Sequence, residues 1–246
     1  MYLKLIILGI IQGLTEFFPV SSSGHLVMLQ EIFGLEEMFL FDIFMHLASF
    51  LAIVLVFRKN IIQLKIKSIF NLFLAMVPTV IIYFIFKRTI GDLFETIKWL
   101  WLFFALSGFI IYFTKFTQQK DKALCAKDAI FIGFLQGCAL LPGLSRSGLT
   151  VSGALYRKIE QTKAIEFSFL LGALAILAAT LLKVPNLIKN DFVFSAPIAC
   201  GFAASFITSL VSLKIIIKII KASKFYRFAY YCWFISIVSL LVKFFS

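Results

Sequence analysis

The chain has 246 residues and a formal net charge of +12, yet 61% of its residues are apolar and its mean hydropathy is +1.01. A soluble domain averages about 45–50% apolar and about 25% charged residues, whereas only 15% of this chain is charged. The apolar excess, including 31 Phe, suits a hydrocarbon environment. The composition predicts an all-α polytopic membrane protein and excludes a nucleic-acid-binding domain despite the basic charge.

Six apolar stretches have about the length of a transmembrane helix, which takes roughly 17–25 residues. They run near 40–57, 68–86, 99–114, 165–182, 193–213 and 228–245. The third is short. Prolines inside two of them are tolerated in a membrane because neighbouring helices satisfy the freed backbone groups. We therefore expect six spans.

Two further apolar regions are split by polar residues and by a segment rich in Pro, Gly and Ser. Their short apolar pieces are 5–18 followed by 26–33, and 129–144 followed by 149–155. A half-length helix, a break and a second short helix predict a re-entrant hairpin. Such irregular backbone is stable at membrane depth when it is buried in protein or lines a wet cavity. The alternative is that each region forms one kinked full span.

The two split regions resemble each other when one is displaced by 124 residues without a gap. The pairs are Gly9 with Gly133, Gln12 with Gln136, Gly13 with Gly137, Ser21 with Ser145, Ser23 with Ser147, and Gly24 with Gly148. This pattern predicts a single membrane domain over residues 1–246 with repeat halves of about 1–123 and 124–246. Because three spans follow each hairpin, the halves should have inverted topology, with both hairpin tips meeting near the midplane.

The basic residues gather on one side of this arrangement. The loops at 58–67, 115–128, 157–166 and 214–227 carry the whole excess of +12, and the other face sums to zero. Loops rich in Lys and Arg stay in the cytoplasm. We therefore expect these loops to be cytoplasmic and the chain termini and first hairpin to belong to the outer side.

Glu16 and Arg146 are the ionic groups that remain deep in the apolar regions. A charged side chain there costs roughly 2.5–3.5 kcal/mol on insertion scales, so the two are expected to serve a purpose. One interpretation is a purely structural ion pair. The other is a functional site, which also explains the hydroxyl groups and glycines around both residues.

Each predicted tip has the composition of an anion-binding site. Hydroxyl groups cap free N–H groups, glycine lets the backbone approach a ligand, and a helix N-terminus attracts negative charge. Gln12 shares a helix face with Glu16, since the two are four residues apart. An acid amid phosphate-binding groups suggests a divalent metal or a base. The candidate substrate-binding residues are Gln12, Ser21, Ser23, Gly24, Ser145, Ser147, Gly148 and Thr150.

The two tip segments resemble the two conserved motifs of the undecaprenyl-diphosphate phosphatase (bacitracin-resistance) family. The segment from Gly9 through Leu26 resembles the first motif, and the segment from Pro142 through Thr150 resembles the second. The length and span pattern fit as well. The first family motif begins with Glu or Gln four residues before a second Glu, and the Gln12 of this chain leaves Glu16 as its single carboxylate.

The resemblance implies a hydrolase of the bacterial inner membrane that faces the outer side. It would convert undecaprenyl diphosphate into undecaprenyl phosphate and inorganic phosphate, using Mg²⁺ or Ca²⁺. By position, Glu16 would bind metal or act as a base, and Arg146 would clamp the phosphate. Ser22 and His25 would supply the nucleophile or the acid and base; attack by Ser22, by His25 or by water stays open. The partners implied are a polyprenyl diphosphate lipid and membrane lipid, without nucleic acid, and an oligomer is compatible.

A polyprenyl-phosphate transporter or flippase is the main alternative. Inverted repeats with broken helices and a midplane anion site are common in transporters. A phosphatidate-phosphatase-like enzyme is disfavoured, because its His six residues beyond the Arg would be Ser152 here. His46 follows Asp42 by four residues, which predicts either a structural Asp–His hydrogen bond or a supporting place beside the site.

Overall fold

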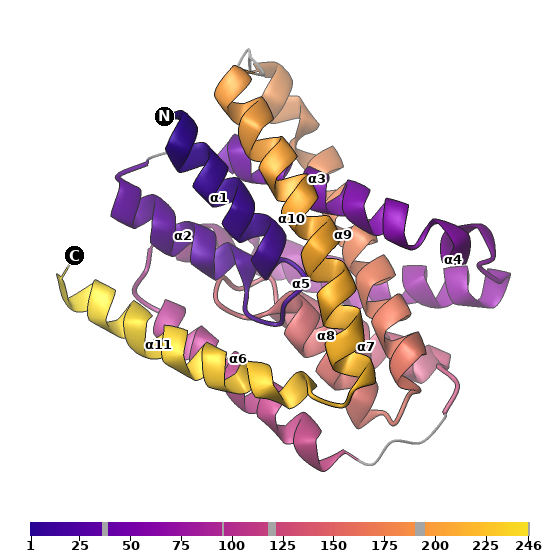
Figure 1. Cartoon of the computed structure of the whole chain (residues 1–246). Helices are drawn as coiled ribbons and strands as arrows, with labels where there is room; N and C mark the ends of the chain where they lie inside the picture. Colours follow the sequence, from indigo (N-terminus) through magenta and orange to yellow (C-terminus); the bar gives the residue numbers. More distant parts are fainter. Residues whose placement is uncertain (36–38, 95, 118–121, 190–194, 246) are drawn as a thin grey trace.

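A computed structural model describes residues 1–35, 39–94, 96–117, 122–189 and 195–245. Within these ranges the regular structure is helical, without a strand (Figure 1). The longer helices are α1 (Tyr2–Thr15), α2 (Ser22–Phe33), α3 (Phe39–Val56), α5 (Ile66–Phe94), α6 (Leu100–Tyr112), α7 (Ala126–Cys138), α8 (Arg146–Tyr156), α9 (Gln161–Lys189), α10 (Ala196–Lys221) and α11 (Phe228–Phe245). The short ones are α4 (Arg58–Ile62) and the 3₁₀ turns η1 (Phe113–Phe116) and η2 (Phe225–Arg227).

Among the described residues, four helical segments are long and apolar enough to cross a membrane: Ile66–Phe94, Gln161–Leu182, Ala196–Lys221 and Phe225–Phe244. Four of the six predicted spans thus have sufficient length. The other two predicted spans form shorter apolar helices over Phe41–Val56 and Leu100–Phe116. The expectation of an all-α multi-pass membrane protein is confirmed.

Both split regions fold as hairpins of two short helices. In the first, Nζ of Lys4 near the start of α1 donates to the carbonyl of Phe33 at the end of α2, at 2.8 Å. In the second, Nε of Arg157 just after α8 donates to Oδ1 of Asp128 in the first turn of α7, at 2.6 Å. The outer ends of each helix pair therefore meet, which excludes a single kinked span. The two contacts occupy equivalent positions of the repeat, since Asp128 lies 124 residues after Lys4 and Arg157 lies 124 residues after Phe33.

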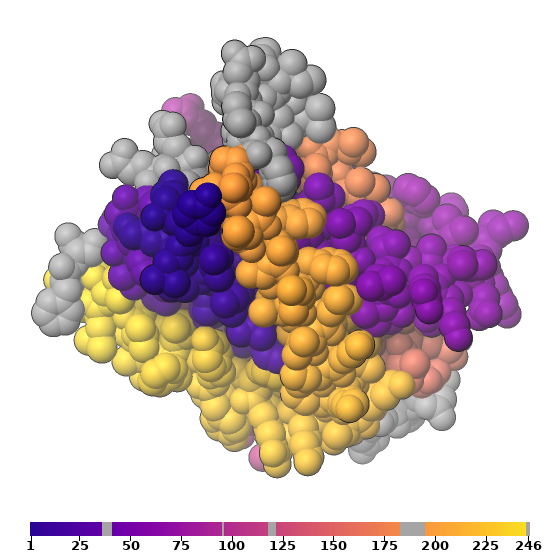
Figure 2. Space-filling view, turned by 45° about the horizontal axis from the view of Figure 1, so that its top comes forward, coloured from indigo at the N-terminus to yellow at the C-terminus, as the bar shows by residue number. Residues whose placement is uncertain are grey.

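The two halves of the chain are packed through each other. The first hairpin helix, α1, lies along α10 of the second half, and α7 lies along α5 of the first half. The first apolar helices after each hairpin, α3 and α9, contact one another, as do the last, α6 and α11. Figure 2 shows α1 (indigo) and α10 (orange) side by side on one face, with α11 (yellow) along its edge.

Glycine permits the closest of these helix contacts. A methyl group at Gly9 would overlap the backbone carbonyl of Gly201 on α10, and one at Gly133 would overlap the carbonyl of Ala75 on α5. Close backbone approach at small residues is typical of helix packing in membranes, where van der Waals contact drives association. The repeated glycine pair is thus a packing device that appears once in each half.

The interior differs from the outer surface in a way that suits lipid. The largest core cluster joins residues of both halves, including Phe17, Phe169 and Leu213. Many large apolar side chains are exposed on the long helices, such as Phe84 on α5 and Phe234 on α11. Surface of this kind is unfavourable in water but neutral against hydrocarbon. The four long helices therefore present their apolar outer faces to the membrane.

Candidate functional site

Two helix N-termini form the site, each capped by a serine of the predicted motif. Ser21 caps α2, and its Oγ accepts from the N–H of Gly24 at 3.4 Å. Ser145 caps α8, and its Oγ accepts from the N–H of Gly148 at 3.0 Å. Ser21 has a φ of 64°, a conformation that is uncommon for a residue other than glycine and that clusters at functional sites.

The two tips touch each other. The Oγ of Ser21 accepts from the N–H of Gly143 in the second tip at 3.1 Å. The Oγ of Ser147 donates to the carbonyl of Phe18 in the first tip at 3.2 Å. Any side chain at Gly24 would overlap the backbone of Gly143, so glycine is required for this approach. The predicted meeting of the two hairpin tips is therefore present.

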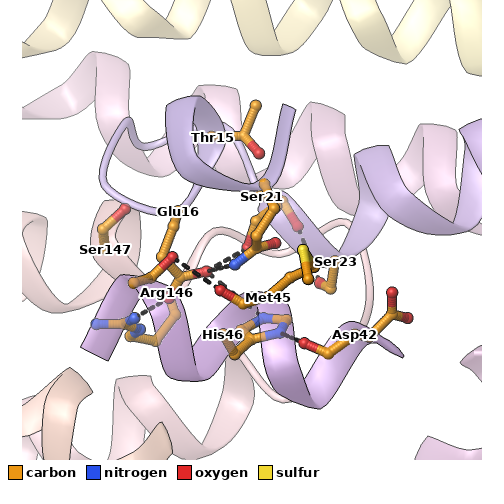
Figure 3. A network of polar contacts seen from close by, with 12 residues as sticks. Thr15, Glu16, Ser21, Ser23, Asp42, Met45, His46, Arg146 and Ser147 are labelled. Carbon is orange, nitrogen blue, oxygen red and sulfur yellow. Dashed lines mark hydrogen bonds and ion pairs between the residues drawn. The ribbon is translucent and has the colours of Figure 1, made fainter. Parts of the chain in front are cut away.

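Glu16 is the centre of the polar contacts between the tips (Figure 3). It is buried and follows the last residue of α1. One carboxylate oxygen, Oε2, accepts from Nε2 of Gln12 at 2.9 Å and from Oγ of Ser22 at 2.6 Å. The other, Oε1, accepts from Nη2 of Arg146. An ion pair in such surroundings is stable only with this kind of additional hydrogen bonding.

Arg146 reaches Glu16 through a notch in α9, which is the gap that the missing side chain of Gly172 leaves in the helix surface. A side chain at Gly172 would overlap the guanidinium group of Arg146. Within the described part of the chain, the buried Nη1 of Arg146 has no hydrogen-bond partner. An unpaired buried donor costs about 1–3 kcal/mol. Among the described residues, the guanidinium therefore has one buried donor without a partner, next to Gly172. Nothing in the sequence pattern had pointed to Gly172.

His25 is held by two hydrogen bonds away from Glu16. Its Nδ1 lies 2.8 Å from the carbonyl of Ser21, and its Nε2 lies 2.9 Å from the hydroxyl of Tyr231 on α11. Because a carbonyl only accepts, Nδ1 donates and Nε2 of the neutral ring accepts from Tyr231. The ring also stacks on that of Tyr231. His25 thus supports the unusual backbone of Ser21. Nothing in the sequence pattern had pointed to Tyr231.

His46 on α3 lies beside the carboxylate. Its Nδ1 donates to the backbone carbonyl of Asp42 at 2.7 Å, and its Nε2 lies 3.5 Å from Oε2 of Glu16. The carboxylate of Asp42 accepts instead from Nε2 of Gln30 at 2.8 Å. The predicted Asp–His hydrogen bond is therefore present, although the backbone carbonyl of Asp42 accepts it and the carboxylate does not. The ring also lies beside Glu16, so the two alternatives do not exclude each other.

The remaining candidate residues make hydrogen bonds at or near the two tips. Ser23 contacts Ser21 at 3.3 Å between hydroxyl oxygens, and Ser147 contacts Ser145 at 3.4 Å. Thr150 lies one turn further along α8, where its hydroxyl donates to the carbonyl of Arg146 at 2.8 Å. Thr150 is therefore bonded within the helix that carries Arg146, and not to the carboxylate of Glu16.

The oxygen atoms around Glu16 are the groups that a hard cation such as Mg²⁺ or Ca²⁺ would use. In the described ranges no group of three or more His, Cys, Asp or Glu side chains is arranged to hold a metal. Among the same residues, Oε1 of Gln12 is buried and has no hydrogen-bond partner. Its amide group is bonded to Glu16 through Nε2, so an unused oxygen lies next to the carboxylate. Mg²⁺ commonly takes few protein oxygens and completes its shell with water and substrate phosphate. The residues fit a cation held in that way.

A second ionic cluster lies at the base of the second hairpin. Both carboxylate oxygens of the fully buried Asp128 accept from Nζ of Lys122 at 2.8 Å. Arg157 and Cys125 donate to the same carboxylate. Burial alone would raise the pKa of Asp128, but the hydrogen bonds from Lys122, Arg157 and Cys125 outweigh it and hold the pKa well below its usual range. This cluster fastens α7 to the end of α8 and is structural.

The fold and site define a class of protein: a helical, multi-pass membrane protein with two hairpin tips that meet around a Glu–Arg pair. The model of the family "bacitracin resistance protein BacA" matches residues 5–238. The chain belongs to this family.

Several curated relatives carry the name undecaprenyl-diphosphatase. One from Carboxydothermus hydrogenoformans is 38% identical over 97% of this chain and 96% of its own length. One from Thermotoga petrophila is 35% identical over 96% of this chain and 99% of its own. Undecaprenyl-diphosphatase 3 of Bacillus cereus is 35% identical over 99% of this chain and 98% of its own.

Proposed function

We propose that this protein hydrolyses undecaprenyl diphosphate to undecaprenyl phosphate and inorganic phosphate, and that it thereby confers bacitracin resistance. The relatives' names supply the substrate. The observation that carries the proposal is the single carboxylate of Glu16, which contacts both the hydroxyl of Ser22 and the guanidinium of Arg146. A carboxylate that contacts both a hydroxyl group and a guanidinium group suits phosphoryl transfer. The hydroxyl can attack phosphorus, the carboxylate can take its proton, and the guanidinium can bind the phosphate oxygens.

Ser22 is the nucleophile that the geometry favours. Its hydroxyl already donates to Glu16 at 2.6 Å, whereas both ring nitrogens of His25 are engaged by Ser21 and Tyr231. Oγ of Ser22 attacks the terminal phosphorus, its proton passes to Glu16, and undecaprenyl phosphate leaves. Water then cleaves the phosphoserine, which releases phosphate and restores the hydroxyl. Arg146 and the two helix N-termini stabilise the negative charge on the phosphoryl oxygens.

A divalent cation, Mg²⁺ or Ca²⁺, completes the site in this proposal. Glu16 and the amide oxygen of Gln12 would hold it together with the substrate phosphates. The unpartnered Oε1 of Gln12 within the described residues supports this assignment. When bound, such a cation neutralises charge on the diphosphate.

The architecture proposed is an inverted repeat in which each half contributes a re-entrant hairpin and three spans. The packing of α1 on α10 and of α7 on α5 supports it, as do the mutual contacts of α3 with α9 and of α6 with α11. The shorter helices α3 and α6 would be the remaining spans. The basic loops lie in the cytoplasm, the site faces the outer side, and the membrane is the bacterial inner membrane.

Release of phosphate from undecaprenyl diphosphate by purified protein in detergent tests the function. The wild type releases phosphate, a chelator lowers the rate, and Glu16→Ala and Arg146→Ala abolish it. A flippase would bind the lipid in this assay and release no phosphate, because detergent has no compartments between which to move it. Lipid binding without release would therefore overturn the proposal.

A further inference from the structure

A buried serine on α6 holds the backbone of the second tip. Ser107 is fully buried, and its Oγ donates to the carbonyl of Gly143 at 3.2 Å. The same oxygen accepts from the N–H of Ser145 at 2.9 Å. A hydroxyl group can donate and accept at once, so this single side chain satisfies one backbone acceptor and one backbone donor. The turn that leads into α8 is therefore fixed by a residue of the other half of the chain.

The two backbone groups that Ser107 binds determine where α8 begins. Ser145 is the cap of α8, and Arg146 is the first residue of that helix. Gly143 has a φ of 93°, which glycine adopts readily, and its N–H donates to Oγ of Ser21 in the first tip. One hydroxyl group thus holds both the residue that joins the two tips and the residue that precedes Arg146.

The same face of α6 also packs against the first tip. Phe104 lies three residues before Ser107, and residues with this spacing share a helix face. Its ring is edge-on to that of His25, with 5.3 Å between centroids, and a side chain at Gly24 would overlap it. This face of α6 contacts the first tip through a ring and the second through a hydroxyl group, so it sets the placement of one tip relative to the other.

The repeat gives Ser107 a counterpart on α11. The position 124 residues after Ser107 is Tyr231, whose hydroxyl donates to His25, and His25 donates to the carbonyl of Ser21. The position 124 residues after His25 is Leu149. The second tip therefore has no imidazole at the equivalent position, and Ser107 binds the backbone directly. Each tip is supported by a hydroxyl group of the opposite half, at the same position of the repeat.

We propose that Ser107 is a positioning residue, whose hydroxyl acts through Gly143 and Ser145 to place Arg146 and the N-terminus of α8 against the phosphate groups of the diphosphate lipid. This inference rests on the proposed function, because it concerns the same site. Helix N–H groups and a guanidinium group bind phosphate through directed hydrogen bonds. A displacement of about 1 Å can cost a hundredfold in rate. Loss of the hydroxyl should therefore weaken anion binding and slow the reaction together.

Four proteins test the role of Ser107: the wild type, Ser107→Ala, Ser107→Thr, which keeps the hydroxyl group, and the control Ser236→Ala. Ser236 on α11 is buried and donates to the carbonyl of Trp101 on α6 at 2.6 Å, so its loss affects the packing of α6 and leaves the bonds of Ser107 in place. Phosphate release in detergent gives kcat and KM, calorimetry gives the affinity for inorganic pyrophosphate, and thermal unfolding checks the fold.

We expect Ser107→Ala to weaken pyrophosphate binding and to lower kcat/KM, each by about tenfold to a hundredfold. Ser107→Thr and Ser236→Ala should stay within about threefold of the wild type. A purely structural role would lower the melting temperature and leave the KM and the pyrophosphate affinity of the folded protein unchanged. If Ser107→Ala does not fold, Ser107→Cys takes its place, since a thiol has about the size of a hydroxyl group and is a weak donor and acceptor.

The outcomes separate the two proposals. Wild-type protein that binds pyrophosphate but releases no phosphate would defeat the proposed function, and the affinities of the Ser107 variants would still decide the inference. Folded Ser107→Ala with the affinity and kcat/KM of the wild type would overturn it. A loss in Ser236→Ala as large as that in Ser107→Ala would also overturn it, because the packing of α6 would then be the cause. Folded Ser107→Thr as impaired as Ser107→Ala would do the same, and wild-type protein that neither binds pyrophosphate nor releases phosphate would overturn both proposals.

Discussion

The two hairpin tips are built alike but carry different side chains at their centres. Both begin a helix with a capping serine, and in each that serine contacts a second serine two residues later. Yet the first tip contains the carboxylate of Glu16 and the hydroxyl of Ser22, whereas the second contains the guanidinium of Arg146. Ser22 and Arg146 occupy the same position of the repeat.

This difference shows how a duplicated frame produces one site. Two equal tips would give two helix N-termini with the same charge, which attract an anion but supply no base. The replacement of one tip serine by Arg146 and the presence of Glu16 in the other tip create an ion pair across the repeat. In the proposed function, the repeated helix N-termini would bind the anion, and the two residues that break the repeat would carry out the reaction.

The largest expected effect comes from removing the hydroxyl group that distinguishes the first tip. Ser22→Ala should lower phosphate release by about a thousandfold or more, because the covalent route is lost. The matched control is Ser68→Ala, which removes a serine hydroxyl in the first turn of α5. The assay is phosphate release in detergent. Near-normal turnover of Ser22→Ala would assign the attack to water or His25.

A smaller effect is expected at Gly172, where a methyl group competes with the guanidinium of the second tip. Gly172→Ala should push Arg146 away from Glu16 and lower kcat/KM by roughly tenfold to a hundredfold. The fold should survive, because the displaced atoms are the end of a flexible side chain. Gly91→Ala is the control, since a methyl group there meets no atom of the described residues within 4 Å. Equal activity of the two variants would show that the notch does not matter.

The support of the first tip by Tyr231 is expected to matter less. Tyr231→Phe keeps the stacked ring and removes the hydroxyl that donates to Nε2 of His25. The loss of one neutral hydrogen bond, about 0.5–1.5 kcal/mol, should lower kcat by about threefold to tenfold. Steady-state kinetics with a thermal-unfolding control measures this. A loss as large as that of Ser22→Ala would mean that His25 takes part directly in the reaction.

Variants at the bases of the two hairpins should differ in their effect on the stability of the protein rather than on its activity. Asp128→Asn breaks the ionic cluster of the second hairpin, which we expect to cost about 1–3 kcal/mol, whereas Lys4→Met removes only the bond to Phe33. The folded-state pKa of Asp128 is lowered, so its stabilisation is complete above the unfolded pKa of about 3.9 and falls as pH drops below that value. Thermal unfolding should show a smaller difference in melting temperature between the wild type and Asp128→Asn at pH 3 than at pH 7. A constant gap would contradict this.

Much of the site could be predicted from the sequence because ionic groups in apolar segments are rare and must find partners. Glu16 and Arg146 were recognisable for that reason, and the breaks at Pro19 and Pro142 located the tips. The repeat of Gly and Ser positions then predicted that the tips meet. These are local or periodic patterns, which can be recognised in a sequence without knowledge of the tertiary structure.

Other parts of the site depend on contacts between distant segments. Tyr231 lies 206 positions from His25 and belongs to an apolar helix whose aromatic residues all look alike in sequence. Gly172 is one of 13 glycines, and only its position against Arg146 gives it a purpose. His46 was placed near Asp42 by helical spacing, but helical spacing could not show that Nε2 faces Glu16.

A double-mutant cycle on Glu16 and Arg146 tests most directly whether the two tips form one catalytic unit. It compares kcat/KM for undecaprenyl diphosphate in Glu16→Gln, Arg146→Leu, the double variant and the wild type. The account predicts strong coupling, with the double variant about as slow as the slower single variant, because residues that act as a unit are not additive. Independent effects that multiply in the double variant would contradict a single site assembled from both halves.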